Sequence, residues 1–101
     1  MARVRWTLQA LDDIDAICDF IARDAPRTAK KVGQRLYEAV EPLERFPQSG
    51  RIVPELGRSN IRELRLKRYR IIYRILDKDV VEILTVYHSA RLLDLDLLLS
   101  D

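Results

Sequence analysis

The side chains best suited to chemistry in this sequence are arginines that alternate with apolar and aromatic residues. Arg70 and Arg74 fall between Tyr69, Ile71 and Tyr73, so a strand there would place the arginines on one face and the apolar residues on the other. A guanidinium makes bidentate contacts with carboxylate or phosphate groups that a lysine ammonium does not make. We expect either a recognition surface for an acidic partner or polyanion, or a solvated face whose charges protect a sheet edge.

His88 is the only imidazole, and it is the natural acid or base at neutral pH. It lies at the predicted end of the last strand, three residues before Arg91. If the chain cleaves RNA, the candidate catalytic set is Arg62, Arg70, His88 and Arg91, which would act by metal-free acid–base chemistry on a polyanion. The alternative is that His88 is a packing residue. The sequence leaves undecided which face of the sheet Arg62 lies on, because strand alternation places it on the same face as Leu64 and Leu66.

Other chemistries lack the residues they need. One Cys and one His exclude an internal disulfide and a structural zinc site. There is no glycine-rich phosphate loop and no serine nucleophile elbow, and we find no paired carboxylates that indicate a metal site. We therefore expect no cofactor and no metal. The sequence has no secretory signal and no apolar run of membrane-spanning length, which predicts a cytoplasmic protein without membrane partners.

Charge is distributed unevenly along the 101 residues, although 18 basic and 16 acidic side chains leave a net charge of only +2. Residues 1–50 are balanced, and residues 76–101 carry a net charge of −4. Residues 51–75 carry a net charge of +6, because only Glu55 and Glu63 oppose eight basic side chains: Arg51, Arg58, Arg62, Arg65, Lys67, Arg68, Arg70 and Arg74.

The first half of the chain predicts a short strand and two helices. Val4 and Trp6 indicate the strand, and Thr7 is a candidate N-cap for a helix over residues 8–23, with Asp12 and Asp13 near its positive end. Apolar residues at helical spacing form one stripe of this helix, on which Cys18 is expected as a buried thiol. A second helix begins at Pro26 and is expected to kink or end near Pro42, giving an antiparallel hairpin.

The second half of the chain predicts strands. From Ile61 onward, apolar residues recur at every second position, as in a strand. Lys67-Arg68 marks a hairpin turn, and residues 77–79 mark a second turn. Residues 80–88 are expected to form a central strand, and residues 54–60 remain irregular. The prediction is an α+β fold of one domain over residues 1–101, in the order β-α-α-β-β-β. Its helical hairpin packs on one face of a small, mainly antiparallel sheet of three or four strands, and the other face is open or covered by a partner.

Six leucines crowd into residues 92–99, more than a small core readily buries. We expect some of them, with Leu95 and Leu98 as candidates, to contact another chain.

Taken together, these segments resemble the ParE branch of the RelE/ParE toxin superfamily, the toxic halves of bacterial type II toxin–antitoxin pairs. The resemblance covers nearly the whole length, and the order and spacing of its segments make it specific. The segments are VRWT (4–7) with Ala10, Asp13 and Ile14; FIA (20–22); LERFPQSGR (43–51); VPE (53–55); IREL (61–64); YRIIY (69–73); and VYHSAR (86–91).

The resemblance implies a toxin neutralised by a cognate antitoxin, often of the ParD type, whose acidic, amphipathic C-terminal segment covers the sheet and its basic groove. For ParE-like members it implies inhibition of DNA gyrase, growth arrest and plasmid stabilisation without enzymatic activity. For RelE-like relatives it implies ribosome-dependent mRNA cleavage. No sequence-specific DNA binding is expected of the toxin alone. The residues expected to bind antitoxin or target are Arg51, Arg62, Arg65, Arg70, Arg74, Arg91, Leu95 and Leu98.

Two departures separate this chain from the cleaving branch. It has no lysine pair in the loop before the second strand, and no tyrosine follows Arg91. Both departures favour gyrase inhibition over RNA cleavage, with an interaction module lacking toxicity as a third alternative.

Overall fold

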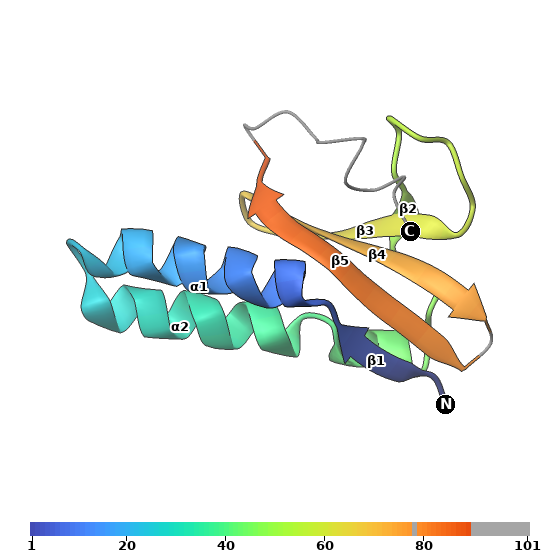
Figure 1. The fold of residues 1–101 in the computed structure, drawn as a ribbon, viewed down its shortest axis with the longest axis horizontal. Coiled ribbons are helices and arrows are strands. Elements are labelled where there is room, and N and C mark those ends of the chain that lie inside the picture. The colour runs from blue at the N-terminus through green and yellow to red at the C-terminus, as the bar shows by residue number, and fades with distance from the viewer. Residues whose placement is uncertain (78, 90–101) are drawn as a thin grey trace.

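A computed structural model describes residues 1–77 and 79–89 of the chain. Two antiparallel helices, α1 (Leu8–Ala22) and α2 (Pro26–Glu38), lie on one face of a twisted sheet (Figure 1). The strands lie side by side in the order β1-β5-β4-β3-β2. Their bounds are β1 Arg3–Trp6, β2 Arg51–Ile52, β3 Ile61–Leu66, β4 Tyr69–Asp77 and β5 Val80–His88. The predicted α+β class, with a helical hairpin on a mainly antiparallel sheet, is confirmed.

Thr7 fastens the start of α1 to the sheet. Its hydroxyl oxygen accepts from the Ala10 N–H at 3.1 Å and donates to the Ile83 carbonyl at 2.7 Å, so the predicted N-cap is present. Asp12 and Asp13 lie beyond the first turn of α1, which holds no acidic residue, so they do not act there as expected. Asp13 instead accepts hydrogen bonds from the Thr85 hydroxyl and the Val86 N–H, which ties α1 to β5.

The second helix follows the proline pattern. Pro26 occupies the first turn of α2, the helix ends at Glu38, and Pro42 lies in a 3-10 turn over Glu41–Glu44. The two helices approach closely at Gly33, where a Cβ atom would lie 2.9 Å from the Cys18 sulfur. Cys18 is half-buried rather than fully buried, with its sulfur 3.6 Å from the Ala29 carbonyl oxygen.

The three long strands form an antiparallel meander. Lys67 takes a left-handed conformation (φ 54°) in the tight β3–β4 turn, a position that glycine or asparagine usually fills. β5 is an interior strand, paired with β4 on one side and with the parallel β1 on the other. A register shift sets Ile72 opposite Thr85 and Tyr73 opposite Ile83, leaving Leu84 as the extra residue of a bulge.

The two-residue strand β2 is the element that the sequence pattern did not predict, and it brings the sheet to five strands. A run of two residues has no readable period, and β2 depends on its pairing with β3, where Arg51 lies opposite Glu63. Gly50 allows this approach, because a Cβ atom there would lie 2.6 Å from both the Glu63 carbonyl oxygen and the Tyr73 hydroxyl. That hydroxyl donates to the Pro47 carbonyl at 2.7 Å and accepts from the Gly50 N–H at 2.9 Å.

Apolar residues are buried on both faces of the sheet. The main core lies between the sheet and the helices and includes Ile14, Leu36, Ile71 and Tyr73. A smaller core on the other face consists of Val53, Ile61, Ile72 and Tyr87, with Leu56 and Leu84 packed against it. The face expected to be open is therefore partly covered by the irregular segment after β2.

Candidate functional site

The Arg70 guanidinium is the centre of an ion-pair cluster on the sheet face that points away from the helices. Arg70 is only 6% exposed. Its Nε and one terminal nitrogen each donate to Glu63 at 2.8 Å, and its two terminal nitrogens donate to Glu55 at 2.8 and 3.0 Å. All four carboxylate oxygens thus accept from one guanidinium, which uses most of the five N–H groups that an arginine has.

The charges of this cluster stabilise one another. The hydrogen bond to Glu55 raises the pKa of Arg70 above its ordinary value, although burial opposes the change. The hydrogen bond from Arg70 in turn lowers the pKa of Glu55, although desolvation acts the other way. Both groups are therefore ionised at neutral pH, and Arg70 is a permanent cation with its charge already matched.

Tyr87 of β5 lies against the same guanidinium. The Arg70 guanidinium carbon is 5.4 Å from the centre of the Tyr87 ring, within the range of a cation–π contact. Burial raises the pKa of the Tyr87 phenol. This ring therefore packs as a neutral aromatic group beneath the ion pair, which is unlike the environment of a general base.

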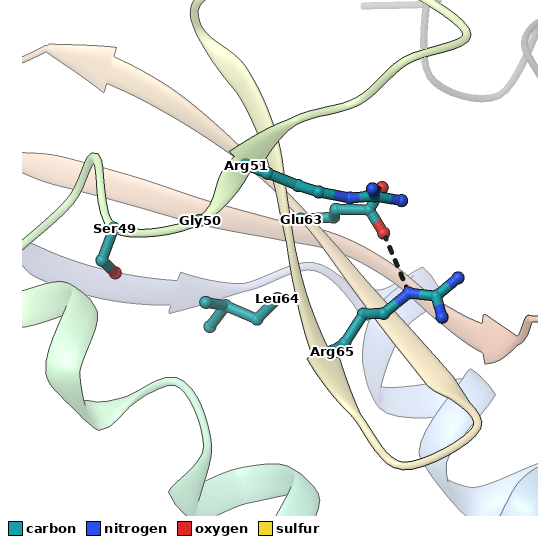
Figure 2. A pocket seen from close by; sticks show the side chains of 6 residues that line it. All are labelled: Ser49, Gly50, Arg51, Glu63, Leu64 and Arg65. Carbon is teal, nitrogen blue, oxygen red and sulfur yellow. Dashed lines mark ion pairs between the residues drawn. The ribbon is translucent and has the colours of Figure 1, made fainter.

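Two exposed arginines flank Glu63, Arg51 from the edge strand β2 and Arg65 from β3, the strand of Glu63 itself. Arg51 Nε lies 3.2 Å from a Glu63 oxygen, and Arg65 Nε lies 3.9 Å from the other. The side chains of Arg51 and Arg65 are 58% and 52% exposed, whereas that of Glu63 is inaccessible. A hollow of about 480 Å³ is lined by Ser49, Gly50, Arg51, Glu63, Leu64 and Arg65, and Figure 2 shows the guanidinium groups of Arg51 and Arg65 beside the Glu63 carboxylate. This is the accessible part of the basic cluster, and it can accept an acidic group from a partner.

Arg74 belongs to a separate ion-pair cluster on the same face. It donates to one oxygen of Glu82 at 2.7 Å, and Arg5 of β1 donates to the other at 2.7 Å. Burial alone would raise the pKa of Glu82, but the hydrogen bonds from Arg74 and Arg5 outweigh it and lower the pKa. Arg74 is therefore ion-paired with a carboxylate of the neighbouring strand β5, which it shares with Arg5.

Arg62 has a different role from the other arginines of the set. It donates to the Ser59 carbonyl at 3.0 Å and to the Gln48 and Gly50 carbonyls at 3.2 and 3.0 Å. These bonds hold together the loops on either side of β2, so Arg62 fixes the backbone that carries Arg51.

His88 lies on the opposite side of the sheet from Arg70. Its ring makes an edge-to-face contact with Tyr69, at 5.7 Å between ring centres, and Tyr69 packs against the helix-side core. His88 also lines a hollow of about 590 Å³ between α1 and the ends of β4 and β5. Tyr87, the preceding residue, faces the other way, as strand alternation requires.

The structure therefore brings together only part of the predicted set. Arg51, Arg65 and Arg70 meet around Glu63, whereas Arg62, Arg74 and His88 each lie elsewhere. Arg70 and Arg74 do point away from the helices, but carboxylates of the same chain bind both of them. Arg91, Leu95 and Leu98 lie outside the described residues.

Glu55 is the participant that sequence reasoning missed. Glu63, the other acid of the +6 segment, contacts both Arg65 and Arg70. Glu55 lies in an irregular segment, where no periodicity predicts which way a side chain points. Its one signal was that it is among only two acids in the +6 segment.

Within residues 1–77 and 79–89, no group of three or more His, Cys, Asp or Glu side chains is arranged to hold a metal ion. No helix in this part of the chain has the length and hydrophobicity to cross a membrane.

Fold and site define a small α+β protein that carries an arginine-rich sheet face opposite a helical hairpin. A family model described as the ParE toxin of the type II toxin–antitoxin system parDE matches residues 4–93, so the chain belongs to the ParE toxin family. It is the toxin of a type II system of the RelE/ParE superfamily, as the resemblance implied.

Two curated proteins are similar to this chain. Toxin RelE2 of Caulobacter vibrioides is 38% identical over 93 residues, which cover 91% of this chain and all of that protein. Putative toxin Y4kP of Sinorhizobium fredii is 46% identical over 90 residues, which cover 86% of this chain and 88% of that protein.

Solved structures that share the fold include two from toxin–antitoxin systems. A chain of the chromosomal ParDE toxin–antitoxin system of P. aeruginosa aligns with a TM-score of 0.71 at 27% identity, covering 87% of this chain and 96% of that one. A chain of the RelBE2 toxin–antitoxin complex of Mycobacterium tuberculosis aligns with a TM-score of 0.55 at 29% identity, covering 86% and 96%.

Proposed function

We propose that this toxin inhibits DNA gyrase, and so arrests replication, without itself being an enzyme. Membership of the ParE family carries the proposal, because the resemblance to ParE-like members implies gyrase as the target. The positions of the candidate cleavage residues support it. Two carboxylates occupy most of the donors of Arg70, and His88 faces the other side of the sheet, so these two do not converge on one phosphate.

The proposal is tested with purified, antitoxin-free toxin, gyrase and DNA. We expect loss of supercoiling, or cleavage complexes trapped as linear DNA, rising with toxin concentration. Topoisomerase I relaxation in the same buffer is the control for general effects on DNA. Gyrase that keeps full activity with no trapped complex at any toxin concentration contradicts the proposal.

RNA cleavage on translating ribosomes is the second candidate, and the names RelE2 and RelBE2 of two relatives favour it. Primer extension on a translated message would show cuts that disappear in Arg70→Ala or His88→Ala. Arg70→Ala also removes a buried ion pair, so each variant must first match the wild-type circular dichroism spectrum and melting profile. Intact message during growth arrest excludes this candidate.

We further propose that a cognate antitoxin neutralises the toxin by placing acidic side chains against Arg51 and Arg65. The support is that the side chains of Arg51 and Arg65 are more than half exposed while they share the single Glu63 carboxylate, whereas Arg70 and Arg74 are largely buried in their ion pairs. The two solved structures named above, which share this fold, come from toxin–antitoxin systems. In Arg51→Gln/Arg65→Gln we expect antitoxin affinity measured by calorimetry to fall at least tenfold. The charge-matched control is Arg58→Gln/Arg68→Gln, which we expect to leave the affinity unchanged.

A further inference from the structure

A second basic surface lies on α2, away from the arginine-rich sheet face. Arg27, Lys30, Lys31 and Arg35 fall at intervals of three and four residues, so they share one side of the helix, and all four are exposed. We call these four residues the α2 stripe. Within the part of the chain that the structure describes, none of them has a carboxylate within ion-pair distance.

The position of α2 leaves this stripe accessible. α1 packs on β5, whereas α2 packs chiefly on α1 and so forms an outer edge of the helical layer (Figure 1). The apolar side of α2 holds Ala29, Gly33 and Leu36, which are buried. The stripe therefore faces solvent along its whole length.

We infer that the α2 stripe binds the phosphate backbone of duplex DNA, so that the toxin contacts the DNA that gyrase holds. That the bound DNA is the DNA held by gyrase rests on the proposed function. That the stripe binds phosphates of a duplex does not rest on it. Residues 27–35 extend about 12 Å along the helix axis, a length over which one DNA strand presents about three to four phosphates. Gln34 lies between the cations and is also exposed, but its amide donates to the Glu38 carboxylate at 2.9 Å. The phosphate contacts are therefore assigned to the four cations alone, and Glu38 marks the end of the stripe.

The composition of the stripe favours DNA over an acidic protein. Protein interfaces that bind stably have a desolvated core of aromatic or aliphatic anchors, and the α2 stripe has no apolar side chain among its cations. Binding to a phosphate backbone needs only positioned charges and is independent of sequence. Because such binding does not depend on base sequence, it is consistent with the expectation that the toxin alone recognises no specific DNA sequence.

Acidic residues on α1 limit the strength of this surface. Asp15 and Asp19 are exposed, and Asp15 is close enough to Cys18 and Tyr37 to raise the pKa of both together with burial, which places it toward α2. DNA must approach from the α2 side to avoid these carboxylates. Neutralising Asp15 is thus expected to strengthen binding, opposite in sign to removal of a cation.

The first test measures binding of the free toxin to a fluorescein-labelled 30-base-pair duplex of mixed sequence by anisotropy, between 50 and 200 mM KCl. Four phosphate contacts predict that the logarithm of the binding constant falls with the logarithm of salt concentration with a slope of about −3.6. Lys30→Gln/Lys31→Gln should reduce the magnitude of this slope by about 2, and Asp15→Asn should tighten binding severalfold. Arg58→Gln/Arg68→Gln, with the same change of charge elsewhere, should leave the slope unchanged.

Three results overturn the inference: no binding at 50 mM KCl, an equal loss in the control variant, or tighter binding of a 30-nucleotide single-stranded RNA than of the duplex. The second test repeats the gyrase assay with Lys30→Gln/Lys31→Gln, for which we expect at least tenfold weaker inhibition. If this variant inhibits gyrase as strongly as wild type, the DNA contact is not part of the inhibition mechanism, and the proposed function is unaffected. If wild-type toxin leaves gyrase active, the proposed function fails while the anisotropy still decides whether the stripe binds DNA.

Discussion

The cations of the sheet face and those of the α2 stripe are similar in type but differ in what surrounds them. On the sheet, Arg70 and Arg74 meet Glu63, Glu55 and Glu82 at hydrogen-bond distance. On α2, the four basic residues of the stripe lie along one exposed side of the helix. None of them forms an ion pair in the described part of the chain. Arg70 and Arg74 are thus paired although their segment carries a net charge of +6, whereas the half of the sequence with zero net charge contains a stripe without an ion pair in the described residues.

The difference follows from the geometry of the two kinds of element. Neighbouring strands bring side chains distant in sequence to within about 5 Å, so an acid on one strand neutralises an arginine on the next. A helix presents only residues three and four apart to one another, and α2 offers no acid at those positions before Glu38. Charge available to a partner therefore depends on strand register and helix spacing, and not on the net charge of a segment.

The largest effect that separates the two regions is expected from Glu63→Gln. Glu63 is 1% exposed and contacts Arg51, Arg65 and Arg70, so neutralising it leaves three guanidinium groups around one uncharged amide. We expect a loss of about 3 kcal/mol in the free energy of unfolding, as when one partner of a buried ion pair is removed. Urea unfolding followed by circular dichroism measures it.

The matched control is Glu41→Gln, which makes the same chemical change at an exposed position of the 3-10 turn. We expect it to alter the free energy of unfolding by less than about 0.5 kcal/mol. A loss below about 1 kcal/mol in Glu63→Gln would contradict the view that the sheet arginines are held by their carboxylates.

A smaller loss is expected from Arg70→Lys, which keeps the charge and removes the planar donor set. A lysine ammonium cannot make paired contacts with Glu55 and Glu63 together, and it loses the stacking on Tyr87. We expect about 2 kcal/mol of destabilisation in the same urea assay. Equal stability of the Arg70→Lys variant and wild type would show that charge alone, without bidentate geometry, accounts for the cluster.

The sheet region also predicts a pH dependence that the α2 stripe does not share. The hydrogen bond from Arg70 lowers the folded-state pKa of Glu55, and the pKa of Glu82 is lowered as well. A lowered folded-state pKa stabilises the fold above the unfolded value of about 4.3, and this contribution is lost as the pH falls through the folded-state pKa. Urea midpoints measured from pH 7 to pH 3 should decline below about pH 4.5. The decline should be shallower in Glu55→Gln, and a parallel decline in both proteins would contradict the assignment.

Most of the fold was readable from local patterns. Thr7, Pro26 and the period of two from Ile61 predict elements that the structure contains, because capping, proline geometry and strand alternation are local properties. β2 was missed because two residues form a strand only through β3, with Gly50 allowing the approach.

The candidate site was less predictable for the same reason. Alternation placed Arg70 and Arg74 on the correct face, but their neutralisation depends on register with Glu63 and Glu82 and on the path of an irregular segment to Glu55. The location of His88 on the other face follows from alternation with Tyr87, a signal that was present in the sequence. The α2 stripe was also visible as an i, i+3, i+4 pattern, but averaging charge over residues 1–50 concealed it.

The smallest stability effect is expected on α2, and it is informative because it is small. Lys30 and Lys31 are exposed and have no ion pair in the described residues, so Lys30→Gln/Lys31→Gln should change the free energy of unfolding by less than about 0.5 kcal/mol. Removing like charges that lie three or four residues from Arg27 and Arg35 relieves repulsion, which makes a slight stabilisation the expected sign. If this double variant keeps its stability but loses DNA affinity and salt dependence, the two lysines serve binding and not folding. A loss above about 1 kcal/mol in urea unfolding would instead place these lysines in the same structural role as the arginines of the sheet.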